Sequence, residues 1–316
     1  MVRISVIIPS YNRATVVHQA IESVLAQSCR PNEVIVVDDG SSDGTLEVLN
    51  KYRNEIVIVR QTNQGASAAR NAGLAIATGD WISFLDSDDI WYPNRIAILL
   101  RDIHATEAGV HVANSILEGP DSEIELFRLR GIKGPAEQAI MVDSGFEWAS
   151  GLQLGSVGIR RDWLTRVGGF DSSMSIYEDV HLLYRLSVLG PWQFTAEIVA
   201  RVRRIAGDKG ALSRKAIANR DYSARMYAKI FEDLRAVSEL NPSQRIAACR
   251  HLSGALLKLA YTKACAGNST EAKQALFRSA REHPSFKGWI KIVPPLLLGR
   301  IGYEAILGVR RGFYRD

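Results

Sequence analysis

Apolar runs and helically spaced apolar positions alternate along the first hundred residues. The runs cover residues 4–9, 33–39, 56–60 and 81–86, and each is short and apolar enough to predict a buried strand. Between the first two runs, apolar side chains recur at the spacing of a helix, at Val17, Ala20, Ile21, Val24 and Leu25. Such alternation predicts an α/β fold with a mostly parallel sheet that is covered by helices on both faces.

The pattern weakens over residues 110–200 and then changes character. A helix is expected to open near Glu178. Beyond about residue 205 the pattern is helical, and the pairs Asn241–Pro242 and Gly267–Asn268 separate its segments. We therefore predict an α/β domain over residues 1–205 and an α-helical C-terminal region over residues 206–316.

Acidic residues cluster directly after two of the predicted strands. Asp38 and Asp39 follow the second strand, and Asp86, Asp88 and Asp89 follow the fourth. Ligands of parallel sheets usually bind at the carboxyl ends of the strands. Grouped carboxylates repel one another, and a divalent cation bound to a polyphosphate removes that cost. The alternative interpretation is that these acids are solvated turn residues.

Bulk composition excludes few classes of protein. The chain has 316 residues, a net charge of +5 and 47% hydrophobic residues, which is typical of a folded protein. Its three cysteines show no zinc or redox spacing. The loop after the first strand, PSYNRATVV, contains no glycine, which argues against a dinucleotide oxidoreductase and a sugar nucleotidyltransferase. The basic stretches match no nucleic-acid-binding module, so no nucleic-acid partner is expected.

The N-terminus and the hydropathy pattern bear on location. The opening MVRISVIIPSYN has only a short apolar run before Pro9, which indicates a strand and not a signal peptide. No window of 18–20 residues is apolar enough to predict a membrane-spanning helix. We expect a cytoplasmic protein, with peripheral attachment at the inner face of the cytoplasmic membrane as a further hypothesis.

Five ordered blocks carry a resemblance to a known family. The blocks are SVIIPSYNR, EVIVVDDGSSDGT, NQGASAARNAGL, GDWISFLDSDD and GGFDSSMSIYEDVHLLYRL. In order and spacing they resemble the family 2 glycosyltransferases of the GT-A fold, of the type that serves bacterial polysaccharide synthesis. The resemblance covers about residues 2–205, and the ordered series is far more specific than any single block.

The resemblance assigns roles on the donor side. It implies that Pro9, Tyr11 and Arg13 surround the nucleotide base and phosphates, and that Asp39 accepts a hydrogen bond from the pyrimidine ring. For Tyr11 the alternative is a structural aromatic residue. Arg70 suits phosphate or sugar hydroxyls, but it could equally form a salt bridge with Asp86 or Asp88.

The same resemblance assigns the metal. Asp86 and Asp88 resemble the DxD pair of the family, which implies Mn²⁺ or Mg²⁺ as the cofactor. Asp88 is the expected metal ligand, and Asp86 is expected to reach the ribose. Asp86 and Asp89 remain further candidates for the metal shell.

On the acceptor side, the family match places the catalytic base at Asp179. Transfer with inversion requires that the acceptor hydroxyl lose its proton as it attacks, and a carboxylate can take that proton. Glu178 is expected to bind acceptor hydroxyls. The alternative is that both are ordinary acids at a helix N-terminus, where the helix dipole favours them.

Together these features predict an inverting, metal-dependent glycosyltransferase. It would move a sugar from a nucleotide-diphospho-sugar, with UDP favoured, to a saccharide or lipid-linked saccharide in cell-surface polysaccharide or glycolipid synthesis. The alternatives are an inactive nucleotide-sugar-binding or scaffold protein and, less favoured, a sugar nucleotidyltransferase.

Two basic stretches leave open how the protein meets anionic partners. Residues 201–225 hold eight Lys and Arg against two acidic residues, which fits either a solvated helix face or a contact with diphosphate or anionic lipid. Many relatives carry an Arg-x-His and a serine here, which help close over the diphosphate. This chain has Arg203, Arg204, Lys209 and Ser213, with Ala206 in place of the expected His. Residues 281–316 hold seven Lys and Arg among aromatic and apolar residues, which fits either an anionic membrane surface or a helix packed on the domain.

Overall fold

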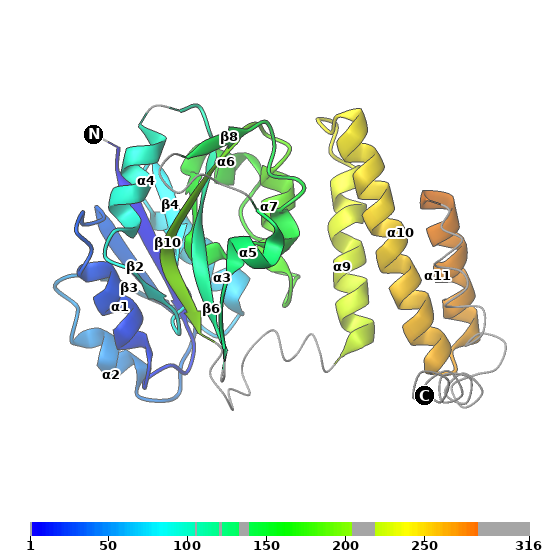
Figure 1. Ribbon diagram of the computed structural model, residues 1–316. Coiled ribbons are helices and arrows are strands. Elements are labelled where there is room, and N and C mark those ends of the chain that lie inside the picture. The colour runs from blue at the N-terminus through cyan, green and yellow to red at the C-terminus, as the bar shows by residue number, and fades with distance from the viewer. Residues whose placement is uncertain (1, 105, 120–121, 133–138, 204–218, 284–316) are drawn as a thin grey trace, which may run out of the picture. The chain divides into compact units, whose positions relative to one another are not determined.

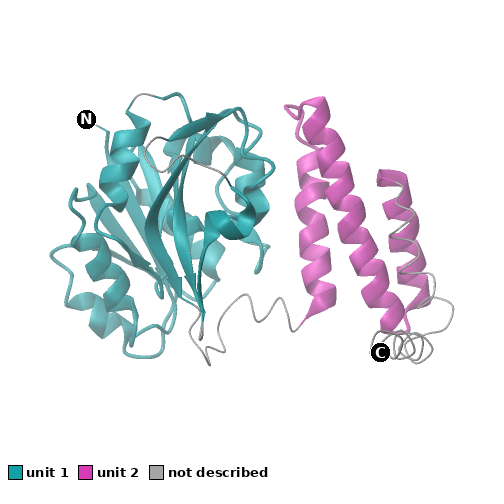
Figure 2. Cartoon of the chain, viewed as in Figure 1, with its two compact units in different colours: residues 1–208 teal, residues 209–316 magenta. Residues whose placement is uncertain are grey.

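The computed structural model describes residues 2–104, 106–119, 122–132, 139–203 and 219–283. The chain divides into two compact units, residues 1–208 and 209–316, shown in different colours in Figure 2. Each unit is described by itself below. The predicted boundary between an α/β domain over residues 1–205 and a helical region over residues 206–316 stays a prediction.

The first unit is built on one sheet, whose first four strands are parallel (Figure 1). In spatial order these strands are β3 (Val57–Arg60), β2 (Glu33–Asp38), β1 (Ile4–Ser10) and β4 (Trp81–Phe84). They coincide with the four predicted apolar runs. Because all four run the same way, the loops that follow them gather at one edge of the sheet.

The other half of the sheet is mixed. Beyond β4 come β9 (Val157–Arg160), β6 (Val110–Glu118), β10 (Trp192–Arg203) and β5 (Ile90–Trp91). β9 runs antiparallel to both of its neighbours, β6 and β10 are parallel, and β5 is antiparallel to β10. The short strands β7 (Glu123–Glu125) and β8 (Ile140–Val142) pair with β6 and β10. The parallel pattern expected from the sequence therefore holds for residues 4–84 and gives way to mixed pairing afterwards.

Helices cover both faces of the sheet, as the apolar strands predict. In the described part of this unit the helices are α1 (Val17–Leu25), α2 (Thr45–Asn50), α3 (Ala66–Ile76), α4 (Arg95–Ile103), α5 (Leu126–Arg130), α6 (Arg161–Arg166) and α7 (Glu178–Leu186). Two short 3₁₀ turns lie at Ala149–Gly151 and Leu154–Ser156. One core cluster joins α1 and α4 to alternate residues of β1 and β2, such as Val6, Ile8 and Val36.

Helix α3 lies close against the opposite face of the sheet. A Cβ atom on Gly73 would come within 2.6 Å of Ile7 Cγ2 and 3.3 Å of Val37 Cγ2. The approach leaves no room for a side chain at Gly73. This contact holds α3, and with it Arg70 three residues earlier in the helix, against β1 and β2.

Strand β10 contains an irregular segment. Its pairing with β6 shifts register between Thr195 and Ile198 and again between Ile198 and Ala200. The bulged strand then continues to Arg203 and pairs with β5. Bulges bend a strand and re-aim the side chains that follow, and here they carry β10 to the loop that contains Asp88.

The second unit is helical in its described part, with α9 (Arg220–Arg235), α10 (Pro242–Cys265) and α11 (Ser269–Glu282). A capping box between Asn241 and Gln244 starts α10, which agrees with the break expected there. The α10–α11 pair is fastened by Ser253 Oγ, which lies 2.9 Å from Ser279 Oγ. Among the described helices, none combines the length and the apolar character needed to cross a membrane.

We expect Gly73→Ala to destabilise the first unit by about 1–3 kcal/mol, because the added methyl group would force Ile7 and the α3 backbone apart. The matched control is Gly254→Ala in α10, where a Cβ would meet no atom within 4 Å. That change should stabilise its helix by about 0.5–1 kcal/mol. Urea denaturation followed by circular dichroism measures both, and equal effects of the two changes would contradict the close packing of α3.

Candidate active site

The loops after β1 and β2 are joined by hydrogen bonds from the backbone of one to side chains of the other. Asn12 N donates to Ser41 Oγ at 2.9 Å, and Ser42 N donates to Asn12 Oδ1 at the same distance. Arg13 N donates to Thr45 Oγ1 at 2.9 Å. Asn12 adopts a left-handed backbone with φ of 52°. The rim on which Tyr11 and Arg13 stand is therefore a cross-braced pair of loops.

Asp39 holds a third loop in place. Its buried carboxylate accepts hydrogen bonds from Gln61 Nε2 at 2.7 Å, Gln64 N at 2.9 Å and Gly65 N at 2.8 Å. Gly65, with φ of 90°, immediately precedes α3. One carboxylate thus ties the end of β2 to the entrance of α3.

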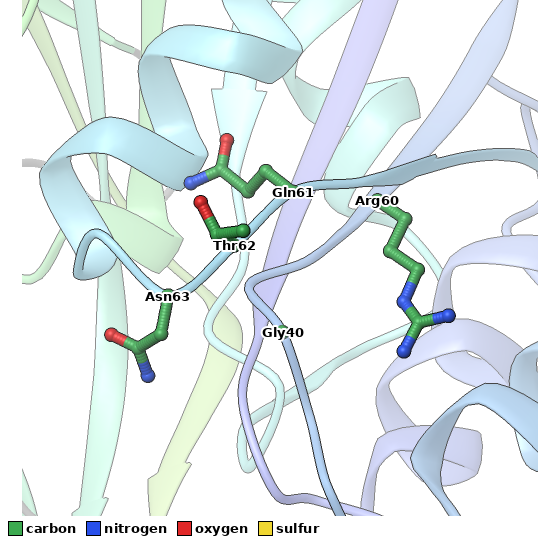
Figure 3. Close-up of a pocket in the computed structure, with 5 residues that line it drawn as sticks. All are labelled: Gly40, Arg60, Gln61, Thr62 and Asn63. Atoms are coloured by element: carbon green, nitrogen blue, oxygen red, sulfur yellow. The ribbon is translucent and has the colours of Figure 1, made fainter.

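A hollow of about 470 Å³ opens at Gly40, the residue that follows Asp39 in the chain (Figure 3). It is lined by Gly40, Arg60, Gln61, Thr62 and Asn63. Figure 3 shows the side chains of Arg60 and Asn63 on either side of Gly40. A Cβ on Gly40 would lie 2.8 Å from Asn63 N, so only glycine lets the two loops approach this closely.

Arg60, Gln61 and Thr62 were missed as candidate residues in the sequence. Arg60 ends β3, and its Nε lies 3.5 Å from Asp38 Oδ2, which is buried. The available signal was the rule that residues after parallel strands line the ligand edge. The rule covers the polar end of β3 as well, although no acidic cluster marks that end.

The turn that follows β4, residues 86–89, will be called the acidic turn. Asp86 and Asp88 remain partly exposed, whereas Asp89 is buried and its Oδ1 accepts from Arg203 N at 2.8 Å. Arg13 Nη2 lies 3.7 Å from Asp88 Oδ2. Burial, and then the charges of Asp86 and Asp88, raise the pKa of Asp89 well above its ordinary value. This mutual repulsion and the exposed carboxylates of Asp86 and Asp88 fit a divalent cation.

Arg70 connects the acidic turn to the start of α7. Its Nη2 lies 2.8 Å from Asp86 Oδ1, and its Nη1 lies 2.9 Å from Glu178 Oε1. The guanidinium carbon lies 5.3 Å from the centre of the Phe170 ring. Burial opposes its charge, but Asp86 and Glu178 outweigh it and raise the pKa of Arg70 above its ordinary value. Of the two roles considered for Arg70, the structure displays the salt bridge with Asp86.

Asp179 stands next to this bridge, in the first turn of α7. Its Oδ1 accepts from Val180 N at 2.7 Å, and the preceding Tyr177 has a left-handed backbone with φ of 61°. Desolvation, followed by the charge of Glu178, raises the pKa of Asp179 to about 7, against the lowering effect of Arg70. A carboxylate with a pKa near 7 can exchange a proton at neutral pH, which is the property of a general base.

Comparison with known proteins places the chain in a family. A sequence profile described as "Glycosyl transferase family 2" matches residues 5–166, about half of the chain. The chain belongs to glycosyltransferase family 2. A protein of Nostoc sp. named as an uncharacterized glycosyltransferase is 33% identical over 208 residues, which cover 64% of this chain and 64% of that protein.

Other relatives are more specific in name but match shorter regions. The Escherichia coli protein WfaP is named as a UDP-Glc:alpha-D-GlcNAc-diphosphoundecaprenol beta-1,3-glucosyltransferase. It is 39% identical over 106 residues, 33% of this chain and 41% of WfaP. The chain thus spans less than two thirds of the length of either relative.

Solved structures show the fold. The crystal structure of Staphylococcus aureus TarS 1–349 in complex with UDP-GlcNAc has a TM-score of 0.70 at 17% identity, covering 99% of this chain and 93% of that one. A mannosyltransferase from Pyrobaculum calidifontis, in complex with GDP-Man and Mn²⁺, has a TM-score of 0.54 at 17% identity, with coverages of 95% and 86%. The predicted α/β GT-A fold and family are confirmed.

Within this family 2 chain, the predicted site residues gather at one edge of the sheet. Pro9 is partly buried at the end of β1, and Tyr11 beside it is exposed. Asp86 and Glu178 are joined through Arg70, and Arg13 approaches Asp88. The roles assigned to these residues toward donor, metal and acceptor stay predictions.

The basic stretch over residues 201–225 begins inside β10, where its first arginines are held by neighbouring residues of the same unit. Arg201 Nη1 lies 2.5 Å from Glu123 Oε1 and 3.2 Å from Glu118 Oε2. Arg203 contacts the acidic turn. The other residues considered for closing over the diphosphate, at 204, 206, 209 and 213, lie outside the described residues, as does the tail over 284–316.

We expect Asp179→Asn to stabilise the protein increasingly as pH rises. The raised pKa means that the folded state keeps a proton that the unfolded chain, with an ordinary aspartate pKa of 3.8, has already lost. Stability of the wild type therefore falls as pH rises through this interval, up to about pH 7. The advantage of the variant should be smallest at about pH 4 and grow by roughly 2–4 kcal/mol by about pH 8 in urea titrations. A difference independent of pH would contradict the raised pKa.

Proposed function

We propose that the protein is an inverting, metal-dependent glycosyltransferase. The donor is a nucleotide-diphospho-sugar, with a UDP-sugar favoured, and the acceptor is the hydroxyl of a saccharide or lipid-linked saccharide. The observation that carries the proposal is the Arg70 bridge, which joins Asp86 of the acidic turn to Glu178, the neighbour of Asp179. A donor-side acid and a base with a pKa near 7 thereby belong to one site.

The donor side would be formed by the strand-end loops. Pro9, Tyr11 and Arg13 border the nucleotide on the β1 side, and Asp39 offers carboxylate oxygens to the ring NH of a pyrimidine. In this structure the Asp39 oxygens accept from Gln61, Gln64 and Gly65, next to the hollow lined by Gly40. A base in that hollow would exchange or share one of these three hydrogen bonds.

The metal would be held by Asp88, with Asp86 as a second oxygen ligand or a ribose contact. A bound Mn²⁺ or Mg²⁺ supplies charge neutralisation for the departing diphosphate. Asp89 is less suited to bind the metal, because it is buried and its carboxylate accepts a hydrogen bond from the backbone of Arg203. Arg13 adds a positive charge beside Asp88.

The acceptor side would be formed by the start of α7. Glu178 is buried and held by Arg70, which orients its second oxygen for an acceptor hydroxyl. Asp179 takes the proton of the attacking hydroxyl, the acceptor oxygen bonds to the anomeric carbon, and the bond to the diphosphate oxygen breaks on the opposite face. The sugar is thereby transferred with inversion.

The named relatives support the choice of substrates. WfaP is named for a UDP-sugar donor and a diphosphoundecaprenol-linked acceptor, and the TarS complex contains UDP-GlcNAc. A lipid-linked acceptor would favour work at the inner face of the cytoplasmic membrane in polysaccharide or glycolipid synthesis. Attachment to anionic lipid through the basic C-terminal region belongs to the same proposal.

We expect Asp88→Ala to remove the Mn²⁺-dependent part of UDP affinity. The loss should exceed about a hundredfold, since changes to outer-shell groups alone cost roughly 10–100-fold in metal affinity. Calorimetry with UDP, with and without Mn²⁺, measures it. Asp80→Ala is the matched control, because Asp80 precedes the same strand at its opposite end and pairs with Arg3. Wild-type affinity in the Asp88 variant would remove Asp88 as the metal ligand.

We expect Asp179→Asn to bind donor normally and to lose transfer by about 10²–10⁴-fold. In the wild type, kcat/KM should rise with pH and level off above about pH 7, because only the ionised carboxylate accepts the proton. A panel of nucleotide sugars, assayed for transfer and hydrolysis, provides the measurement. Asp162→Asn, an acid in the first turn of α6, is the control. Near-normal transfer by the Asp179 variant would exclude it as the base, and no turnover by the wild type with any donor would favour a binding or scaffold protein.

A further inference from the structure

Arg203, the last residue of β10, holds the acidic turn through both its backbone and its side chain. Its backbone N donates to Asp89 Oδ1 at 2.8 Å, and its Nε donates to the main-chain oxygen of Asp88 at 2.5 Å. Its Nη1 donates to Gln19 Oε1 in α1. One residue thus connects the acidic turn to a strand and to a helix of the rigid core.

Strand pairing explains why these contacts form. β10 runs antiparallel to β5, with Ala200 opposite Trp91 and Arg201 opposite Ile90. Continuing this register by two residues brings position 203 opposite position 88. The acidic turn therefore lies alongside the end of β10, where Arg203 can bind it.

The side chain of Arg203 is turned inward. Its Nη2 atom is buried and has no hydrogen-bond partner among the residues that the structure describes. The remaining guanidinium nitrogens bind the Asp88 carbonyl and Gln19. Two of the three guanidinium nitrogens are thus occupied by protein partners, and the third is closed off from solvent.

We propose that Arg203 is a positioning residue for the metal ligand Asp88, and that it does not bind the donor diphosphate itself. The proposal rests on the proposed function, in which Asp88 holds the metal. By fixing the carbonyl of Asp88 and the carboxylate of its neighbour Asp89, Arg203 restricts the backbone from which the Asp88 side chain extends. The entropy cost of ordering Asp88 is therefore incurred when the protein folds and not when the metal binds.

The experiment compares Mn²⁺ affinity with metal-free UDP affinity. In Arg203→Met the apolar stem and the backbone N–H remain, while the bonds to the Asp88 carbonyl and Gln19 are lost. Electron paramagnetic resonance titration of Mn²⁺ at saturating UDP should show affinity weakened about 10–100-fold, the range for outer-shell groups. UDP affinity in excess chelator should be unchanged. Arg203→Lys, which keeps one charged donor, should recover part of the Mn²⁺ affinity.

Arg201→Lys is the matched control. Arg201 lies two residues earlier on β10 and binds Glu118, Glu123 and Tyr92 rather than the acidic turn, so Mn²⁺ affinity should stay at the wild-type level. Gln19→Ala provides a second, milder test in case the Arg203→Met variant does not fold. It removes a single anchor of the guanidinium and should weaken Mn²⁺ binding in the same direction by a smaller factor.

Two results would overturn the positioning role. Unchanged Mn²⁺ affinity in both the Met and the Gln19 variants would show that the turn orders itself without Arg203. An equal loss of UDP affinity in chelator would show that Arg203 contacts the phosphates directly. A wild-type protein that binds UDP but no Mn²⁺ is a separate outcome, which would overturn the proposed metal dependence and the positioning role with it.

Discussion

The buried guanidinium of Arg70 is the interaction on which the rest of the candidate site depends. A cation removed from water is costly unless opposite charges and good hydrogen bonds surround it. Here Asp86 lies 16 residues later in the chain and Glu178 lies 108 residues later, and the Phe170 ring adds a further favourable contact. Since the cation satisfies both acids at once, the start of α7 is held against the parallel half of the sheet.

The loops around this bridge support one another in the same manner. Asn12 and Ser41 join the ends of β1 and β2, and Asp39 joins the end of β2 to the entrance of α3. Each of these hydrogen bonds connects one strand-end loop to a neighbouring loop. The rim is therefore a polar network built on a rigid apolar sheet, and its hydrogen bonds help to hold the loops in one arrangement.

Local pattern was enough for part of this structure. The four apolar runs correspond to β1, β2, β3 and β4 in chain order. The acids that follow two of these strands lie at one edge of the sheet. The insertion of β9 between β4 and β6 could not be read from pattern, because an antiparallel strand from residues 157–160 carries the same apolar signal as a parallel one.

Side-chain contacts between distant segments were also beyond the sequence. The hydrogen bonds of Arg203 to the acidic turn span 114 and 115 residues, and no periodicity connects the two ends. A basic residue in a basic stretch was interpreted through its charge, whereas its neighbours in space determine its contacts. The polar end of β3 was different, since the strand-end rule could have found Arg60 and Gln61.

The register shifts of β10 set how the chain can vary during evolution. Between Thr195 and Ala200 the strand contains more residues than the β6 segment it accompanies, and that surplus decides which residue arrives beside Asp88. Loss of one residue there would leave the pairing of Trp192 with Val110 intact but turn the side chain of Arg203 to the other face of the sheet. The number of residues between Thr195 and Ala200 is therefore constrained by the contact between Arg203 and Asp88 at the end of the strand. The identities of the residues in that segment are less constrained than their number.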